Sequence, residues 1–290
     1  MKVESTYSAA TAGVAAAGSE WPGYRGVIPI KLNRVLWASN GLLIPGMVFF
    51  LWQLAVTRHW VPEQLLPPPS LVWSSLVEML ASGELWEHLS ISLGRLGLSL
   101  LIGCIVGLLL GAMMGVSRQA RAYIYPSFSV LAQFPVIGWV PLLIIFAGID
   151  EALKVAAITI AVVPPVAINT FNSIVNISGK LLEAARVFGF NPLQVVFRLI
   201  VPATVPGVFN GLRQGIMQAW LALVFVELLA SSEGIGYLMV WGRQLLQMDL
   251  IVVSMLVIGL VGLILELLLG WLEKRVQPWQ PAVSEKRQGL

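Results

Sequence analysis

The feature that most constrains this chain is a set of apolar runs longer than about eighteen residues, which is the length at which a helix can cross a bilayer. Inside a membrane the backbone must satisfy its own hydrogen bonds, so only helices and closed barrels can span it. The runs lack the alternating pattern of a transmembrane strand, which favours helices. We therefore expect an all-α integral membrane protein.

Composition supports a chain that water cannot cover. Of its 290 residues, 57% are hydrophobic and only 11% are charged, whereas soluble domains carry roughly 25% charged residues. The single cysteine, Cys104, lies inside an apolar run and permits no internal disulfide. These numbers argue against a soluble protein. They do not indicate a functional site, for which sequence motifs are needed.

Six segments are predicted to span the membrane. The third is the weakest, because Pro126, Pro135 and Pro141 interrupt it. Proline inside a span is tolerated where neighbouring groups satisfy the freed carbonyls, so this segment is expected to be buried in a bundle. The six predicted spans are residues 38–57, 91–116, 123–147, 153–174, 205–230 and 250–271.

The distribution of basic residues predicts the orientation. If the N-terminus is cytoplasmic, the inner segments hold thirteen of the 18 basic residues, and the C-terminus is cytoplasmic too. This N-in/C-in arrangement divides the chain into a disordered cytoplasmic tail (1–36), a transmembrane domain (37–275) and a C-terminal cytoplasmic tail (276–290). A signal peptide is the competing interpretation of the N-terminus, but its charged leader would be too long.

Two outer segments are long enough to carry structure of their own. Residues 59–90 contain a proline-rich stretch and a helix that we expect Ser70 to cap. Residues 231–249 contain a short amphipathic stretch. Both segments suit interfacial helices on the outer leaflet or a docking role, and these two interpretations remain open.

A polar island at residues 176–202 separates the fourth and fifth predicted spans. Its residues up to Phe188 favour a helix, and Gly189 can adopt the left-handed conformation that ends one. Asn191 and Pro192 suit the start of a second helix. We expect Pro202 to stop that helix and let the chain turn into the fifth span. The island is therefore predicted to be a helical hairpin.

The hairpin is expected to expose more apolar surface than a solvated loop needs. A basic rim would surround that surface, and this combination suits either a protein-binding site or an amphipathic helix on anionic lipid. The residues alone do not decide between the two. The apolar positions are Leu182, Ala185, Val187, Phe188 and Val195, and the basic ones are Lys180, Arg186 and Arg198.

The spacing of residues within the hairpin favours the protein-binding interpretation. Glu183-Ala184-Ala185, Gly189 and Pro202 match the EAA loop of the membrane subunits of bacterial ATP-binding-cassette (ABC) importers, which this region resembles. The resemblance implies a type I importer bundle in the inner membrane, with a loop that docks on a cytoplasmic ATPase. The residues implied in coupling are Glu183, Ala184, Ala185, Arg186, Gly189 and Pro202.

Further motifs point to one branch of that family. Leu66-Pro67-Pro68-Pro69-Ser70, Gly148-Ile149-Asp150-Glu151 and Gly234-Ile235-Gly236-Tyr237 resemble the nitrate, sulfonate and taurine permeases. The runs at 83–89 and 148–151 look most like aliphatic sulfonate permeases. The resemblance implies a permease homodimer, two ATPase subunits that bind ATP and Mg, and a binding protein outside the membrane.

Chemistry of other kinds is not visible in the sequence. It contains no phosphate-binding G-x4-G-K-[ST] motif, and His59 and His88 have no metal-ligand spacing. No catalytic constellation is recognisable. We therefore expect no enzyme activity, no bound cofactor, no metal site and no nucleic-acid partner.

An anion crossing the bundle would need hydrogen-bond donors rather than carboxylates. Asn210, Gln214 and Gln218 form a polar stripe on the fifth span, which suits either a water-facing path or contacts between helices. Asn169 and Thr170 follow a Pro-Pro pair in the fourth span. The predicted translocation-path residues are Gln133, Trp139, Asn169, Thr170, Asn210, Gln214, Gln218 and Glu227.

Four ionisable residues fall within spans, where charges are costly. We expect Arg95 to extend outward to the surface and Glu266 to pair with Lys274 or Arg275. Arg213 and Glu227 are fourteen residues apart on one helix, so they cannot pair within a subunit.

The sequence therefore predicts the transmembrane subunit of an ATP-driven importer for an aliphatic sulfonate or taurine. A nitrate or bicarbonate importer permease is the alternative within the family. A stand-alone secondary carrier is the alternative from another class, although no internal repeat supports it.

Overall fold

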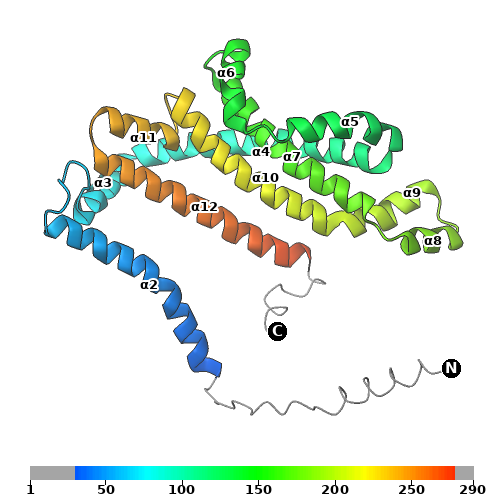
Figure 1. The fold of residues 1–290 in the computed structure, drawn as a ribbon, viewed down its shortest axis with the longest axis horizontal. Coiled ribbons are helices and arrows are strands. Elements are labelled where there is room, and N and C mark those ends of the chain that lie inside the picture. Colours follow the sequence, from blue (N-terminus) through cyan, green and yellow to red (C-terminus); the bar gives the residue numbers. More distant parts are fainter. Residues whose placement is uncertain (1–29, 278–290) are drawn as a thin grey trace, which may run out of the picture. The chain divides into compact units, whose positions relative to one another are not determined.

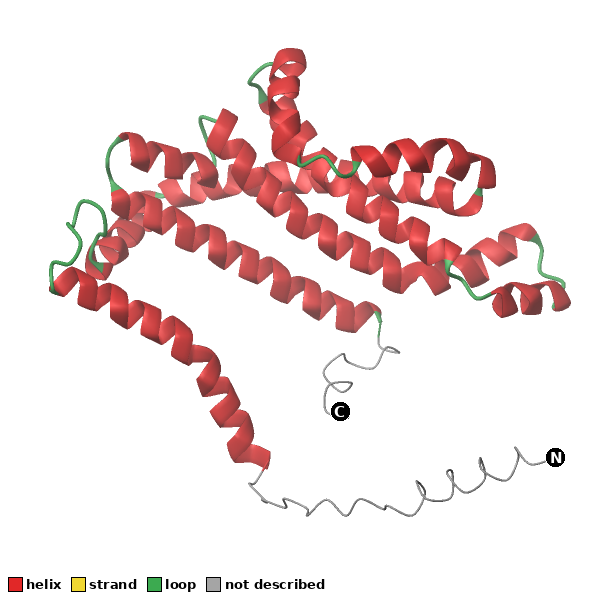
Figure 2. Cartoon of the chain, viewed as in Figure 1, coloured by secondary structure: helices red, strands yellow, loops and turns green. Residues whose placement is uncertain are grey.

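The computed structural model describes residues 30–277, and in the first helix it describes side chains only from Leu43 onward. This part of the chain is helical, with short connections and no strand (Figure 2). Contacts divide the chain after Leu54, and the unit that begins at Ala55 contains the helix bundle. The first helix starts at Ile30, inside the predicted N-terminal tail. Residues 1–29 and 278–290, which carry the rest of both predicted tails, lie outside the described residues.

The elements follow one another with few residues between them, and Figure 1 shows the long helices α4, α7, α10 and α12 lying side by side. The hairpin of α8 and α9 lies at one end of these helices, and α3 and α11 lie at the other. The elements are α2 (Ile30–Thr57), α3 (Pro69–Ser82), α4 (Glu84–Val116), α5 (Arg118–Leu131), α6 (Val136–Ala147), α7 (Glu151–Val175), α8 (Gly179–Val187), α9 (Pro192–Val195), η1 (Val196–Ile200, a π-helical turn), α10 (Val201–Ala230), α11 (Ile235–Gln244) and α12 (Met248–Val276).

Helix α7 is the centre of the bundle and packs chiefly against α4 and α10. A stripe of glycines one turn apart on α4 lets the two backbones approach closely, as in many membrane helix pairs. A Cβ atom placed on Gly111 would lie 2.5 Å from the carbonyl oxygen of Ala167, and one on Gly103 would lie 2.6 Å from Cβ of Val162. Larger residues at these positions would force α4 and α7 apart.

The core between α4, α7 and α10 is apolar, and so is much of the outside of the bundle. Trp220 and Leu223 of α10 are buried against Ile158 and Val162 of α7. Large aliphatic side chains such as Leu109 and Leu267 point outward and are 60% and 64% exposed. An apolar exterior of this kind suits lipid rather than water as the surrounding solvent.

The predicted third span is not one straight helix. Its residues form α5 and α6, which are bent by 97° at the Ala132–Pro135 connection. Pro135 cannot supply a backbone N–H to continue α5, and it sits instead at the cap position before α6. Pro126 and Pro141, in contrast, lie inside their helices. The proline punctuation noted in the sequence thus marks a broken span or a re-entrant loop.

Among the described residues, four helical segments are long and apolar enough to cross a membrane, or five if the bent pair is one span. They are Glu84–Val116, Glu151–Val175, Pro192–Gln244 and Met248–Val276, and Leu43–Thr57 is a shorter apolar helix. The count of six spans and the N-in/C-in orientation therefore stay predictions.

The two outer segments form helices that belong to the bundle. α11 packs on α12, α10 and α4, and its Ile235 and Leu238 are buried. α3 is tied to α12 by a hydrogen bond of 2.5 Å from the Ser75 hydroxyl to Asp249. Ser70 does not cap α3, because the helix begins one residue earlier and Pro68 occupies the cap position.

Candidate functional site: a coupling hairpin, an amide-lined cavity and a buried charge network

The polar island folds as the predicted hairpin. α8 ends before Gly189, whose φ of +68° is the left-handed conformation expected at that position. Asn191 then begins α9 with a capping box: its side chain accepts from the backbone N–H of Gln194, and the Gln194 side chain accepts from the N–H of Asn191. Pro192 occupies the first turn, where its missing N–H is not needed.

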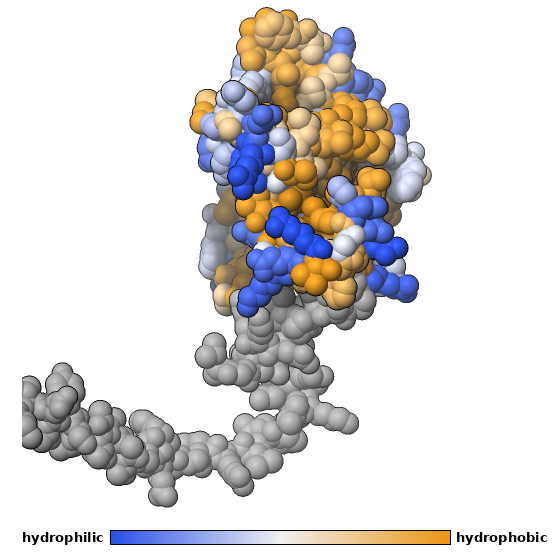
Figure 3. All heavy atoms as spheres, turned by 90° about the vertical axis from the view of Figure 1, so that its right-hand side faces the viewer, coloured by the Kyte–Doolittle hydropathy of each residue, from blue (hydrophilic) through white to orange (hydrophobic). Residues whose placement is uncertain are grey.

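The surface of the hairpin is both apolar and exposed. Val187 and Phe188 are 86% and 77% exposed, and Leu193 and Phe197 are each 68% exposed. Figure 3, which views this end of the molecule, shows hydrophobic and hydrophilic residues next to each other. An apolar patch with a charged surround is typical of a protein-binding surface.

The predicted coupling residues divide by their burial. Glu183, Ala184, Arg186 and Gly189 are exposed, so a partner could reach them. Ala185 is buried and packs inside the hairpin instead of contributing to its surface. Their role in coupling stays a prediction.

Pro202 does not stop the second helix, contrary to our expectation. α9 continues through the π turn of η1 directly into α10, and Pro202 lies in the first turn of α10. The N–H of Val201 bonds to the carbonyl of Val196, five residues back. This wider turn lies directly before Pro202, which has no backbone N–H to donate.

A cavity of about 680 Å³ lies between the α5–α6 connection, α7 and α10. Four predicted path residues line it, namely Gln133, Asn210, Gln214 and Gln218. The three on α10 are spaced one turn apart and are exposed, so the polar stripe faces an open space. The volume lies in the range typical of small-molecule sites.

Asn169 does not line the cavity but holds two residues that do. Its Oδ1 accepts from Asn210 Nδ2 at 3.2 Å, and its Nδ2 donates to Gln214 Oε1 at 3.2 Å. Nδ2 also donates to the carbonyl of Pro165 at 2.8 Å. Asn169 thus links α7 to α10 and orients both cavity amides.

Three other predicted path residues lie outside this cavity. Trp139 packs edge-on against Phe134. Thr170 is buried, donates to the Val166 carbonyl at 2.7 Å, and lines a separate apolar hollow of about 610 Å³ between α4, α7 and α10. Glu227 is fully buried near the far end of α10 and belongs to a charge network.

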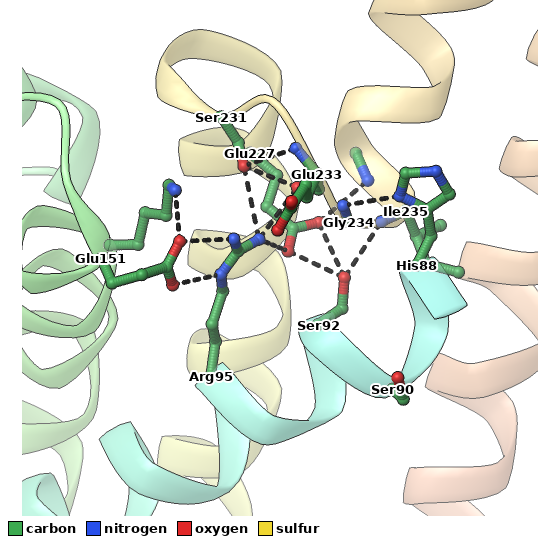
Figure 4. Close-up of polar contacts among 12 residues, drawn as sticks. His88, Ser90, Ser92, Arg95, Glu151, Glu227, Ser231, Glu233, Gly234 and Ile235 are labelled. Carbon is green, nitrogen blue, oxygen red and sulfur yellow. Dashed lines mark hydrogen bonds and ion pairs between the residues drawn. The ribbon is translucent and has the colours of Figure 1, made fainter. Parts of the chain in front are cut away.

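That network is centred on Arg95, which is buried rather than extended to the surface as the sequence suggested. Its guanidinium reaches Glu227 at 2.8 Å and Glu151 at 2.6 Å (Figure 4). It also donates to the carbonyl of Glu233 at 2.9 Å. Lys154 completes the set through Glu151 at 2.5 Å. Two cations and two carboxylates balance each other, which makes the burial of Arg95, Lys154 and Glu227 tolerable, while Glu151 is 59% exposed.

Hydroxyl and backbone donors satisfy the rest of Glu227. The Ser92 hydroxyl lies 2.7 Å from its carboxylate and itself accepts from the N–H of Ile235. The N–H of Gly236 donates to Glu227 at 2.9 Å. The network therefore joins α4, α7, α10 and the start of α11 at the end of the bundle opposite the hairpin. Two of the sequence motifs, at residues 148–151 and 234–237, contribute Glu151 and the N–H groups of Ile235 and Gly236 to it, but nothing in the sequence indicated that they meet.

A second ion cluster lies between α10 and α12, and in it the predicted partner of Glu266 is wrong. Glu266 pairs with Arg213 of α10, not with Lys274 or Arg275. Arg213 also reaches Glu273 at 2.7 Å, so it joins α10 to α12. Arg213 itself lines the cavity, which the sequence did not suggest. The signal that could have found it is its position three residues after Asn210, on the same helical face.

The fold is thus a helical membrane bundle with an exposed apolar hairpin and an open polar cavity. Comparison with known families identifies which bundle it is: the family described as binding-protein-dependent transport system inner membrane component matches residues 103–279. The chain belongs to this family. It is the permease subunit of an ABC importer and a multi-pass inner-membrane protein, as the EAA-like loop predicted.

Similar proteins fall in the branch that the short motifs indicated. The chain is 35% identical over 241 residues to the aliphatic sulfonates transport permease protein SsuC of Bacillus subtilis (strain 168), covering 83% of this chain and 87% of that protein. It is 34% identical to the protein of the same name in Escherichia coli (strain K12), covering 84% and 92%. The taurine transport system permease protein TauC of Escherichia coli (strain K12) is 29% identical, covering 87% and 93%.

A solved structure has the same fold. A chain of the MetNI methionine ABC transporter in an inward-facing conformation aligns with a TM-score of 0.54 and 17% identity, covering 64% of this chain and 92% of that one. At this identity the likeness concerns the fold alone. It agrees with the importer bundle that the sequence predicted.

Proposed function

We propose that this chain forms the translocation path of an importer for a small aliphatic sulfonate, with taurine included in that class. It works as a homodimer, with two cytoplasmic ATPase subunits that bind ATP and Mg and with a solute-binding protein outside. The names of the similar permeases support the substrate class. The exposed apolar hairpin supports the docking of an ATPase, because large apolar side chains such as Val187 and Phe188 are unfavourable in water unless a partner covers them.

The proposed cycle uses the hairpin as the contact for the ATPase. ATP binding draws the two ATPase subunits together, and the hairpins of the two permeases follow. The bundle then passes from inward-open to outward-open, because ATP binds the closed ATPase dimer better than the open one. Glu183, Ala184, Arg186 and Gly189 lie on the contact surface, and Ala185 supports it from inside.

The substrate is tested with the complete complex in proteoliposomes. ATP inside and the binding protein outside should drive uptake of labelled taurine or ethanesulfonate. Nitrate and bicarbonate serve as competitors and test the alternative within the family. Uptake of nitrate without uptake of any sulfonate would refute the proposed substrate class.

The coupling role is tested by a charge reversal on the hairpin. Glu183→Arg should leave the permease in the membrane but abolish uptake and weaken retention of the ATPase. The matched control is Glu78→Arg on α3, an exposed carboxylate far from the hairpin in sequence, which should retain the ATPase. Normal uptake by Glu183→Arg would contradict the coupling assignment.

A further inference from the structure

Arg213 is the one ionisable residue among the described residues that line the amide cavity. Its side chain is 34% exposed. Nη1 donates to Glu273, and Nη2 donates to Glu266. A guanidinium has five N–H donors, and these two bonds use two of them. Three donors remain for another acceptor.

The other polar residues that line the cavity are amides, which can donate hydrogen bonds. Gln133, Asn210, Gln214 and Gln218 line the same cavity, and no carboxylate lies among the lining residues. The Gln214 carbonyl oxygen is occupied by Asn169, which leaves the two amide hydrogens of Gln214 available. The lining of the cavity is rich in N–H groups and holds no carboxylate, since Glu266 and Glu273 contact Arg213 from α12, and such a lining favours an oxyanion over a cation.

The remaining wall of the cavity is apolar. Leu131 and Val136 contribute from α5 and α6, Ile160 from α7 and Met217 from α10. A short alkyl chain fits such a wall, while a fully hydrated inorganic anion would gain nothing from it. The cavity thus has one polar and one aliphatic side, which matches an amphiphilic small anion.

We infer that Arg213, with Gln214 and Gln218 beside it, binds the sulfonate group of the transported solute, and that the aliphatic wall accepts its carbon chain. This inference rests on the proposed function and names the site within it. Glu266 and Glu273 keep the guanidinium paired when the cavity is empty, because an unpaired cation inside a membrane bundle is costly. An arriving sulfonate then uses the remaining donors.

The competing explanation is that Arg213 only ties α10 to α12. Two variants separate the two roles. Arg213→Gln removes the cation but leaves two unpaired carboxylates. The triple variant Arg213→Gln, Glu266→Gln, Glu273→Gln removes all three charges and keeps hydrogen-bonding amides at each position. A merely structural tie should tolerate the triple variant, since it leaves no unpaired charge.

The measurement is sulfonate taken up per ATP hydrolysed, in the full complex with saturating binding protein. Charged hydrogen bonds are strong enough that we expect the ratio to fall about tenfold or more in both variants. Stimulation of the ATPase by the loaded binding protein should persist, because the hairpin is untouched. Wild-type uptake per ATP in the triple variant would overturn the inference.

A second variant keeps the test decisive if the charge changes at Arg213 prevent assembly. Gln218→Glu is isosteric and places a carboxylate in the cavity, and Gln218→Met is the uncharged control of similar length. Gln218→Glu should lower sulfonate uptake at least about tenfold and well below Gln218→Met. Equal uptake by the two would overturn the inference. A wild-type complex that takes up no sulfonate would instead refute the proposed function, so the two failures are distinguishable.

Discussion

Arg95 of α4 and Glu227 of α10 form an ion pair of 2.8 Å in which neither side chain reaches solvent appreciably. The pair joins the helix that carries the glycine stripe to the helix that carries the cavity amides. Buried charges are tolerated only when they are paired and hydrogen-bonded, so a substitution of either residue alone leaves the other charge buried without a partner.

Removing one partner should be more harmful than removing both. Arg95→Met leaves Glu227 buried without its cation and should cost about 3–5 kcal/mol of stability. Arg95→Met combined with Glu227→Leu should recover part of that loss. The check is the fraction of protein that remains monodisperse after heating in detergent, with Glu78→Gln as the control because Glu78 is exposed on α3 and lies outside the network. Equal melting of Arg95→Met and wild type would show that the pair contributes nothing.

The glycine stripe predicts position-dependent effects along one helix. Gly111→Ala places a methyl group against the Ala167 carbonyl and should destabilise the protein by about 1–3 kcal/mol. Gly97→Ala on the same helix meets no atom within 4 Å, so it should be neutral or stabilise by up to about 1 kcal/mol. Thermal stability in one detergent compares the two variants. A loss at Gly97 as large as at Gly111 would argue against close packing as the cause.

The turn of the hairpin should depend on glycine for conformational reasons alone. Gly189 has a φ of +68°, and a Cβ there would meet nothing within 4 Å. Gly189→Ala should therefore cost roughly 1–2 kcal/mol of local stability through backbone strain. Hydrogen exchange of residues 179–200 should rise in Gly189→Ala and not in Gly179→Ala, whose position is equally open and has no positive φ. Unchanged exchange in Gly189→Ala would contradict this account.

The N-in/C-in prediction can be tested with single cysteines. In a background of Cys104→Ser, a cysteine at Val187, which is 86% exposed, should react with a membrane-impermeant maleimide only from the cytoplasmic side. A cysteine at Trp73, which is 67% exposed, should react only from outside. The reverse pattern would overturn the orientation derived from the basic residues.

The sequence was sufficient for features that depend on local chemistry. The hairpin followed from Gly189 and the Asn191-Pro192 pair, because capping and left-handed turns are decided by neighbouring residues. The polar stripe of Asn210, Gln214 and Gln218 followed from helical spacing. The stripe lines a cavity, and Asn210 and Gln214 also hydrogen-bond to Asn169 of α7, so the structure contains both a water-facing surface and contacts between helices.

Features that depend on pairing between distant segments were not accessible. Arg95 and Glu227 are 132 residues apart in the chain, and nothing local marks them as partners. Glu266 could be matched only to neighbours in sequence, so its contact with Arg213 was missed. Pro202 was read by its usual role as a helix stop, while the π turn before it lets the helix continue.

The continuity through η1 has a mechanical consequence. The helical backbone is unbroken from α9 to α10, so the second half of the hairpin and the cavity wall are joined without a loop. Val196 and Gln214 are separated by eighteen positions, or roughly 27 Å of helix. A displacement imposed at the hairpin is therefore passed to the cavity amides along hydrogen-bonded helix, whereas a loop at Pro202 would have absorbed it.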